Sequence, residues 1–155
     1  MDLRVFGLIA IFLIVLLSGC IFLDQQEKFI KKSTNFIDYA PDQKPPGLIQ
    51  RTDETYSSGE YSFTVIIYEM ESYEIAGEVK SSLSEKQSAI KEQVGGYMLT
   101  TIEDNGGPKG YAWLHKNFLV TVAQTKTSNF NNTIEYVNLL RELTEKIFED
   151  YEPTG

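Results

Sequence analysis

The stretch Tyr61–Met70, which reads YSFTVIIYEM, decides the fold of this chain. It is rich in β-branched and aromatic residues, which favour strands. Successive side chains of a strand point to opposite faces, and in this stretch both faces are substantially apolar. Such a pattern is typical of a strand with neighbours on both sides. We therefore expect Tyr61–Met70 to lie in the interior of a sheet.

The sequence that follows this strand predicts a helix. Ser72 is of a residue type that caps helix N-termini. Apolar residues recur at near-helical spacing from there to Val94, and Gly95 and Gly96 are the expected C-cap. Because residues 84–87 also form a capping-box pattern, the segment predicts either one helix or two helices with a bend.

The last third of the chain predicts three more strands, of which the last two form a hairpin, and then a second helix. The predicted strands cover residues 97–103, 110–115 and 118–127. The final helix is predicted to begin at a capping-box-like pair, Asn132 and Glu135, and to end before Pro153.

The sequence before the central strand is less regular. Residues 48–56 predict a strand, residues 40–47 (APDQKPPG) a semi-rigid spacer, and residues 24–37 a short amphipathic helix. The element order predicts an α+β fold with an antiparallel or mixed sheet of about four or five strands and two main helices packed on one face. An N-terminal signal or anchor helix is expected to precede this domain.

The amino terminus has the composition of an export signal. Residues 5–17 carry no charged side chain and follow Arg4. A short basic region followed by an apolar run of this length is typical of a secretory signal peptide.

The motif Leu17-Ser18-Gly19-Cys20 follows directly and contains the only cysteine of the chain. Here the sequence resembles the signal peptide of prokaryotic, archaeal or bacterial, lipoproteins, whose lipobox is an aliphatic residue, two small residues and a cysteine. The resemblance implies cleavage before Cys20 and a lipid on its thiol. The chain would then divide into a signal peptide, a lipidated N-terminus with a short helix and spacer, and a globular α+β domain: residues 1–19, 20–46 and 47–152.

A second interpretation of the amino terminus is an uncleaved transmembrane anchor. The uncharged run continues past Cys20 to Leu23 and approaches the roughly 20 residues that span a bilayer. Both interpretations predict a domain attached to the cell membrane, through a lipid anchor or an N-terminal helix, and facing the extracytoplasmic side.

The charge and the rare residues exclude several classes of function. The net charge is −8, from 14 basic and 22 acidic residues, which argues against a nucleic-acid partner. One cysteine and one histidine exclude an internal disulfide, a cysteine-rich zinc site and a multi-histidine metal site. No metal site and no cofactor is predicted.

Several aromatic residues of the predicted strands are candidates for a binding surface. Tyr97, Tyr111, Trp113 and Phe118 would form an apolar patch with hydrogen-bonding groups if they project from an uncovered face of the sheet. The alternative interpretation places them in the core under the helices. His115 would share a face with Tyr111 and Trp113, at the end of this patch or as a solvent-facing turn residue.

Asn131 begins a glycosylation sequon, Asn-Asn-Thr, which has meaning only in an exported chain. The same residues lie where the final helix is predicted to start, so a helix cap is the other interpretation.

Two classes of function fit these observations. The first is a binding or interaction module for an unknown protein or small-molecule ligand at the membrane surface. The second is a small exported enzyme, for which the sequence shows no nucleophile motif. The layout also loosely resembles small uncharacterised lipoproteins that share a tyrosine-rich central strand followed by a helix with an early alanine, here Ala76. This resemblance implies no particular activity.

Overall fold

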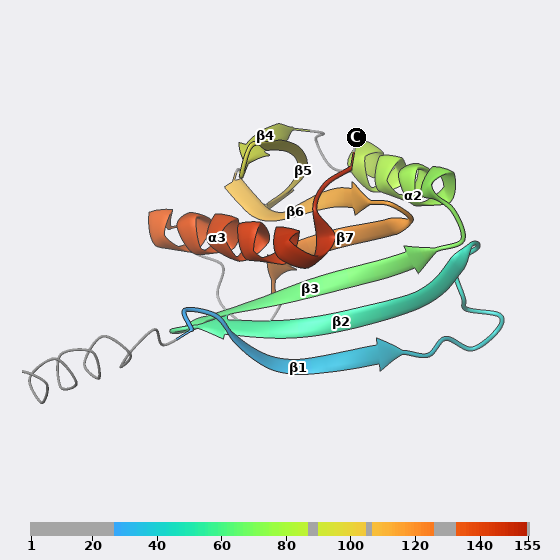
Figure 1. Ribbon diagram of the computed structural model, residues 1–155, viewed down its shortest axis with the longest axis horizontal. Coiled ribbons are helices and arrows are strands. Elements are labelled where there is room, and N and C mark those ends of the chain that lie inside the picture. Colours follow the sequence, from blue (N-terminus) through green and yellow to red (C-terminus); the bar gives the residue numbers. More distant parts are fainter. Residues whose placement is uncertain (1–26, 87–89, 105–106, 126–132, 155) are drawn as a thin grey trace, which may run out of the picture.

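The computed structural model describes residues 27–86, 90–104, 107–125 and 133–154. Within these residues the chain forms seven strands and two helices (Figure 1). The elements are β1 (Ile30–Ile37), β2 (Leu48–Ser58), β3 (Tyr61–Met70), α2 (Tyr73–Lys86), β4 (Lys91–Val94), β5 (Tyr97–Asp104), β6 (Gly107–His115), β7 (Phe118–Gln124) and α3 (Ile134–Tyr151). Neither of these two helices is long and apolar enough to cross a bilayer. The predicted N-terminal signal or anchor helix lies outside the described residues.

All seven strands belong to one antiparallel sheet, in the order β1-β2-β3-β7-β6-β5-β4. The strand predicted at Tyr61–Met70 is confirmed, and it pairs with β2 on one side and with β7 on the other. The predicted hairpin after residue 110 is also confirmed, because β6 and β7 pair from Gly110 with Ala123 to His115 with Phe118.

The two helices lie on opposite faces of the sheet, which explains why β3 is apolar on both. Phe63 and Val65 of β3 belong to the core cluster that contains α3, whereas Tyr68 and Met70 pack with α2. The predicted fold, with about four or five strands and both helices on one face, is therefore wrong. The sequence of β3 indicates that both of its faces are buried, but it does not indicate which helix covers each face.

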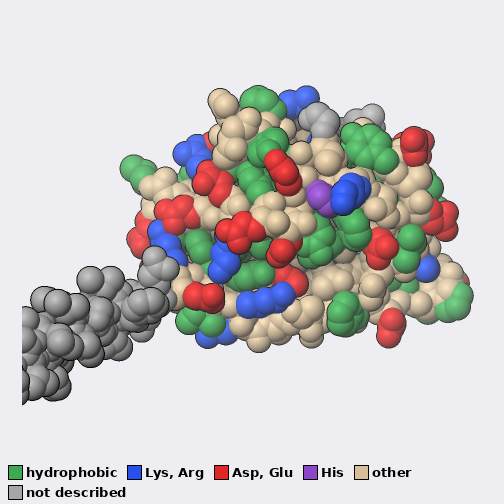
Figure 2. Space-filling model, in the orientation of Figure 1, with side chains coloured by type: hydrophobic (Ala, Val, Ile, Leu, Met, Phe, Trp, Pro, Cys, Tyr) green, Lys and Arg blue, Asp and Glu red, His purple; other side chains and the backbone are tan. Residues whose placement is uncertain are grey.

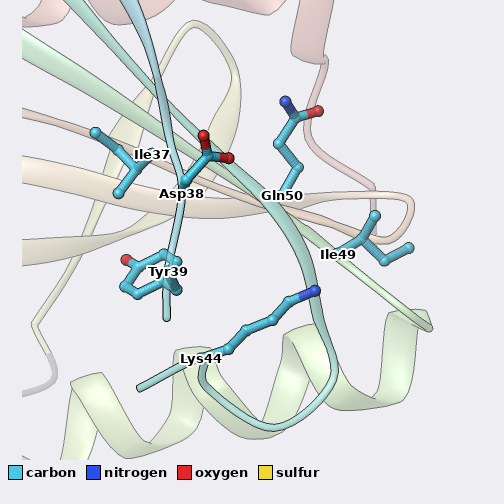
Figure 3. Close-up of a pocket in the computed structure, with 6 residues that line it drawn as sticks. All are labelled: Ile37, Asp38, Tyr39, Lys44, Ile49 and Gln50. Carbon is cyan, nitrogen blue, oxygen red and sulfur yellow. The ribbon is translucent and has the colours of Figure 1, made fainter. Parts of the chain in front are cut away.

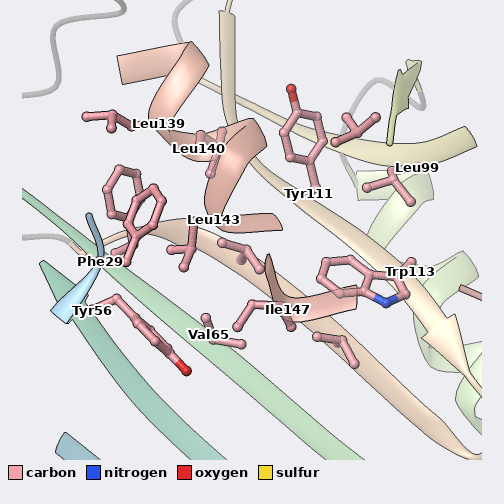
Figure 4. Close-up of a cluster of buried hydrophobic side chains, with 14 of the residues drawn as sticks. Phe29, Tyr56, Val65, Leu99, Tyr111, Trp113, Leu139, Leu140, Leu143 and Ile147 are labelled. Atoms are coloured by element: carbon pink, nitrogen blue, oxygen red, sulfur yellow. The ribbon is translucent and has the colours of Figure 1, made fainter. Parts of the chain in front are cut away.

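The larger core lies between α3 and the sheet (Figure 4). The helix begins after Thr133, whose hydroxyl accepts a hydrogen bond from the Tyr136 amide at 3.1 Å, so the N-cap is Thr133 rather than the predicted Asn132. Its inward residues are spaced as an amphipathic helix requires. They are Tyr136, Leu139, Leu140, Leu143, Thr144 and Ile147.

The helix predicted from Ser72 to Val94 is shorter than expected. Ser72 is the cap, since its hydroxyl accepts from the Ile75 amide at 3.3 Å, but α2 ends at Lys86. The two glycines that follow Val94 have φ values of 53° and 88° and join β4 to β5. Two consecutive positive φ angles are those of a tight hairpin turn, so this glycine pair connects two strands instead of ending a helix.

The helix predicted over residues 24–37 is also wrong, because residues 30–37 are a strand that pairs with β2. Phe29, directly before it, is 5% exposed and packs edge-on against Phe63, with ring centroids 6.3 Å apart. The folded sheet thus begins well before residue 47. The strand β1 is exposed on both faces, so its sequence lacks the alternation that identifies strands.

Candidate functional site

Two of the aromatic residues predicted as a binding surface lie in the core. Tyr111 is 0% and Trp113 is 1% exposed, both under α3 (Figure 4). For these two residues the alternative interpretation, ordinary core, is confirmed. Phe118 is partly buried against the same cluster.

Tyr111 has a polar partner at the edge of this core. Its hydroxyl donates to Glu92 at 2.9 Å, and Glu92 also accepts from the guanidinium of Arg141. Burial and the hydrogen bond to Glu92 raise the pKa of Tyr111 to about 12. The Tyr111 hydroxyl therefore stays neutral and hydrogen-bonded. The contacts among Tyr111, Glu92 and Arg141 link β6, β4 and α3.

Tyr97 and His115 hold the C-terminal strap, the name we give to residues 151–154. The hydroxyl of Tyr97 donates to the Glu152 carboxylate, and Nδ1 of His115 lies 2.7 Å from the Glu152 carbonyl oxygen. A base in a catalytic triad is oriented by a carboxylate, whereas this nitrogen contacts a main-chain carbonyl. His115 thus serves to attach the chain end to the sheet.

The other predicted site residues lie outside the described part of the chain. These are the lipobox residues Leu17, Ser18 and Gly19, the lipidation site Cys20 and the glycosylation site Asn131. Among the described residues, no group of three or more histidine, cysteine, aspartate or glutamate side chains is placed to hold a metal ion. Acidic side chains are scattered over the visible face of the molecule rather than gathered into one patch (Figure 2).

The open edge of the sheet at β1 is a surface that sequence analysis missed. Along its outer side β1 pairs with no other strand of the described residues. Its side chains are largely exposed, including Ile30 (52%) and Phe36 (64%). An edge of this kind presents main-chain N–H and C=O groups that are free to pair with another chain.

Ion pairing attaches the first half of β1 to the sheet. Lys31 forms an ion pair with Glu54 of β2 and lies over the ring of Tyr56. The pairing with β2 is irregular between Lys31 and Ser33, so Lys32 lies at a bulge. From Ser33 to Ile37 the register is regular.

A small cavity lies at the far end of β1, where the chain turns toward β2 (Figure 3). Its volume is about 270 Å³. The lining combines three apolar or aromatic side chains with polar and charged ones. The residues are Ile37, Asp38, Tyr39, Lys44, Ile49 and Gln50.

Arg51 fixes one wall of this cavity. Its guanidinium makes two hydrogen bonds of 2.7 Å to Asp53, donates to the Tyr39 hydroxyl at 3.1 Å, and lies over the Tyr68 ring. The hydrogen bond to Asp53 raises the pKa of Arg51 further above its usual value, so the group remains charged. Asp53 and Tyr68 fix the position of the Arg51 guanidinium, and its hydrogen bond to the Tyr39 hydroxyl in turn orients the Tyr39 ring.

The edge and the cavity together offer unpaired main-chain groups next to a recess whose lining is partly polar and partly apolar. Such a surface can bind a molecule, but it brings together no nucleophile and general base. Searches of protein-family models, curated proteins and solved structures found no match to this chain.

Proposed function

We propose that this protein is a membrane-tethered binding module that faces the extracytoplasmic side of the cell membrane. The tether is a lipid on Cys20. Support comes from the uncharged run of residues 5–17 and from the lipobox-like Leu17-Ser18-Gly19 before that cysteine. Two acyl chains, or one chain with a second signal, are needed for stable attachment, since a single chain binds only marginally.

The observation that supports binding is the open β1 edge, eight residues long and exposed on both faces. The single histidine of the chain contacts the C-terminal strap through its Nδ1. Tethering also raises the local concentration of such a surface near the membrane.

Mass spectrometry of the full-length gene product, expressed in a prokaryotic host and separated into membrane and soluble fractions, tests the tether. We expect the wild-type chain in the membrane fraction, with the mass of residues 20–155 plus a lipid. Cys20→Ser should keep the signal peptide and carry no lipid, whereas the neighbouring control Gln25→Ala should be processed as the wild type. A Cys20→Ser chain of wild-type mass would show that no lipid is attached at this residue.

A further inference from the structure

We propose that one end of the domain, which we call the entry end, docks onto the surface of the bilayer to which the chain is attached, with Ile134 and Ile30 in contact with lipid. The entry end consists of residues 27–32, 54–61, 107–109 and 133–142. This inference rests on the proposed function, because it takes the domain to be attached to a membrane through its amino terminus.

Four segments that are distant in the sequence meet at the entry end (Figure 1, left). The start of β1 at Ile30 pairs with the last residues of β2. The hydroxyl of Tyr61, at the start of β3, lies 3.3 Å from that of Thr133, the N-cap of α3. The hydroxyl of Tyr136 donates to the carbonyl oxygen of Lys109 in β6 at 2.7 Å. These contacts hold the four segments together at the point where the chain enters the domain.

The entry end is the part of the domain that attachment holds nearest to the bilayer. The uncharged run of the sequence ends at Leu23, and the described structure begins at Glu27. An extended chain spans at most about 3.6 Å per residue, so Glu27 lies within about 14 Å of Leu23 and within about 25 Å of Cys20. The eight residues of β1 extend about 26 Å beyond this point. Whichever of the two residues lies at the membrane, the bilayer is closer to the entry end than to the opposite end of the sheet.

Two apolar side chains of the entry end are exposed. Ile134, the first residue of α3, is 83% exposed, the largest value among the exposed large hydrophobic side chains of the described residues, and Ile30 is 52% exposed. A cavity of about 390 Å³ beside Ile134 is lined by this residue, by Leu139 and by four polar or charged side chains. A surface that mixes apolar and polar groups suits the boundary between lipid headgroups and acyl chains, into which an interfacial apolar face is buried by about 5–10 Å.

The charge distribution favours the same end. The segments of the entry end contain five acidic and five basic side chains, although the whole chain carries −8. Within them, Lys28 forms an ion pair with Glu142 and Lys31 with Glu54. The excess of negative charge therefore lies outside the entry end, and an anionic bilayer repels those parts of the surface. Electrostatic repulsion thus turns the balanced end toward the membrane and the acidic remainder away from it.

The other exposed hydrophobic side chains lie away from the entry end. Phe36 and Ile49 are at the opposite end of β1, where the chain passes to β2, and Tyr73 begins α2 after the far end of β3. Ile90 precedes β4, at the other edge of the sheet. Met98 follows the tyrosine whose hydroxyl binds the C-terminal strap. None of these five side chains adjoins the point of attachment.

Quenching of an introduced tryptophan by brominated lipid tests the inference. The full-length chain is reconstituted in phosphatidylcholine vesicles with and without bromine on the acyl chains. We expect the tryptophan of Ile134→Trp to emit roughly half as strongly in brominated lipid, because it lies at the headgroup boundary. Met98→Trp is the matched control, since Met98 is also strongly exposed (60%). It should be quenched no more than the wild type, whose only tryptophan, Trp113, is 1% exposed.

Several outcomes would overturn the inference. Both variants replace exposed side chains, so circular dichroism should show the wild-type fold, and equal quenching in the two, or quenching in neither, excludes docking by the entry end. Quenching that disappears at high salt would assign the contact to charge instead of to the isoleucines. Emission of Ile134→Trp that shifts with protein concentration but not with bromine would identify a second copy as what covers this side chain.

The mass of the mature chain distinguishes this inference from the proposed tether. A lipidated chain that shows no quenching overturns the docking alone. A membrane-bound chain that keeps residues 1–19 and is quenched overturns the lipid on Cys20 but supports the docking. A chain recovered only in the soluble fraction overturns both.

Discussion

The indole Nε1 of Trp113 donates a hydrogen bond to the main-chain carbonyl oxygen of Tyr151, 2.7 Å away. The same indole meets the ring of Phe148 edge-on, with centroids 5.2 Å apart. The bond joins a buried strand residue to the last residue of α3, and the C-terminal strap continues from that point. The strap then adds its own bond, from the Thr154 amide to the Leu114 carbonyl oxygen at 2.9 Å.

Replacing Trp113 with phenylalanine should lower the free energy of unfolding by about 2–4 kcal/mol. The variant leaves the Tyr151 carbonyl without its donor and creates a small cavity against Phe148. Urea denaturation followed by circular dichroism measures the change. Tyr97→Phe removes a more exposed strap contact and should lower the free energy of unfolding by less than Trp113→Phe does. Equal losses in the two variants would contradict the role given to the indole.

The buried tyrosines should make the domain less stable in strong alkali. Burial raises the pKa of Tyr111 from 10.0 to about 12, so the unfolded chain loses this proton at a lower pH than the folded chain does. Stability from this group is complete below pH 10 and is lost as the pH rises toward about 12. Urea midpoints measured from pH 9 to 12 should therefore fall, and they should fall less steeply in Tyr111→Phe. A profile unchanged by that substitution would show that Tyr111 ionises alike in both states.

Two glycines should respond to alanine in opposite directions. A Cβ at Gly110 would lie 2.4 Å from the carbonyl oxygen of Val122 and 2.8 Å from Cβ of Ala123, so β6 and β7 would have to separate. We expect Gly110→Ala to cost roughly 2–4 kcal/mol. Gly77, inside α2, has only Leu114 nearby at 3.9 Å, and Gly77→Ala should add about 0.5–1 kcal/mol. Thermal melts of the two variants make the comparison.

Phe29 should be essential to the folded domain although it precedes the first strand. Its side chain is 5% exposed in the core under α3, so Phe29→Ala should cost about 3–5 kcal/mol. The next residue, Ile30, is 52% exposed, and Ile30→Ala should cost below about 1 kcal/mol. If the two variants unfold at the same urea concentration, Phe29 does not contribute to the core.

The sequence could identify those elements whose own composition reflects how they are buried in the fold. Tyr61–Met70 is apolar on both faces because sheet neighbours and two helices surround it, and local composition reports that burial. The helix at the C-terminus has a regular apolar stripe and was predictable to within two residues at its start. In both cases propensity and periodicity point to the same structure.

The elements that sequence analysis missed are defined by their pairing with another strand and give no periodic signal of their own. β1 is a strand because Ile30–Ile37 pairs with β2, and its lysines and exposed faces give no periodic signal. β4 depends on the turn at Gly95 and Gly96, and a glycine pair also fits a helix end. The candidate site was missed for the same reason, since an edge becomes visible only when the strand order is known.

The entry of the chain into the sheet at β1 also has a mechanical consequence. A force applied to the residues before Phe29 would act along the axis of β1, parallel to the hydrogen-bonded ladder between β1 and β2. The load then acts in shear on the paired residues of β1 and β2, from Ile30 with Ser57 to Ile37 with Arg51. Their hydrogen bonds therefore share the force instead of opening one after another. Phe29, seated between the sheet and α3, is the first residue to resist. The geometry therefore favours a domain that stays folded when a force is applied at the N-terminal end of β1.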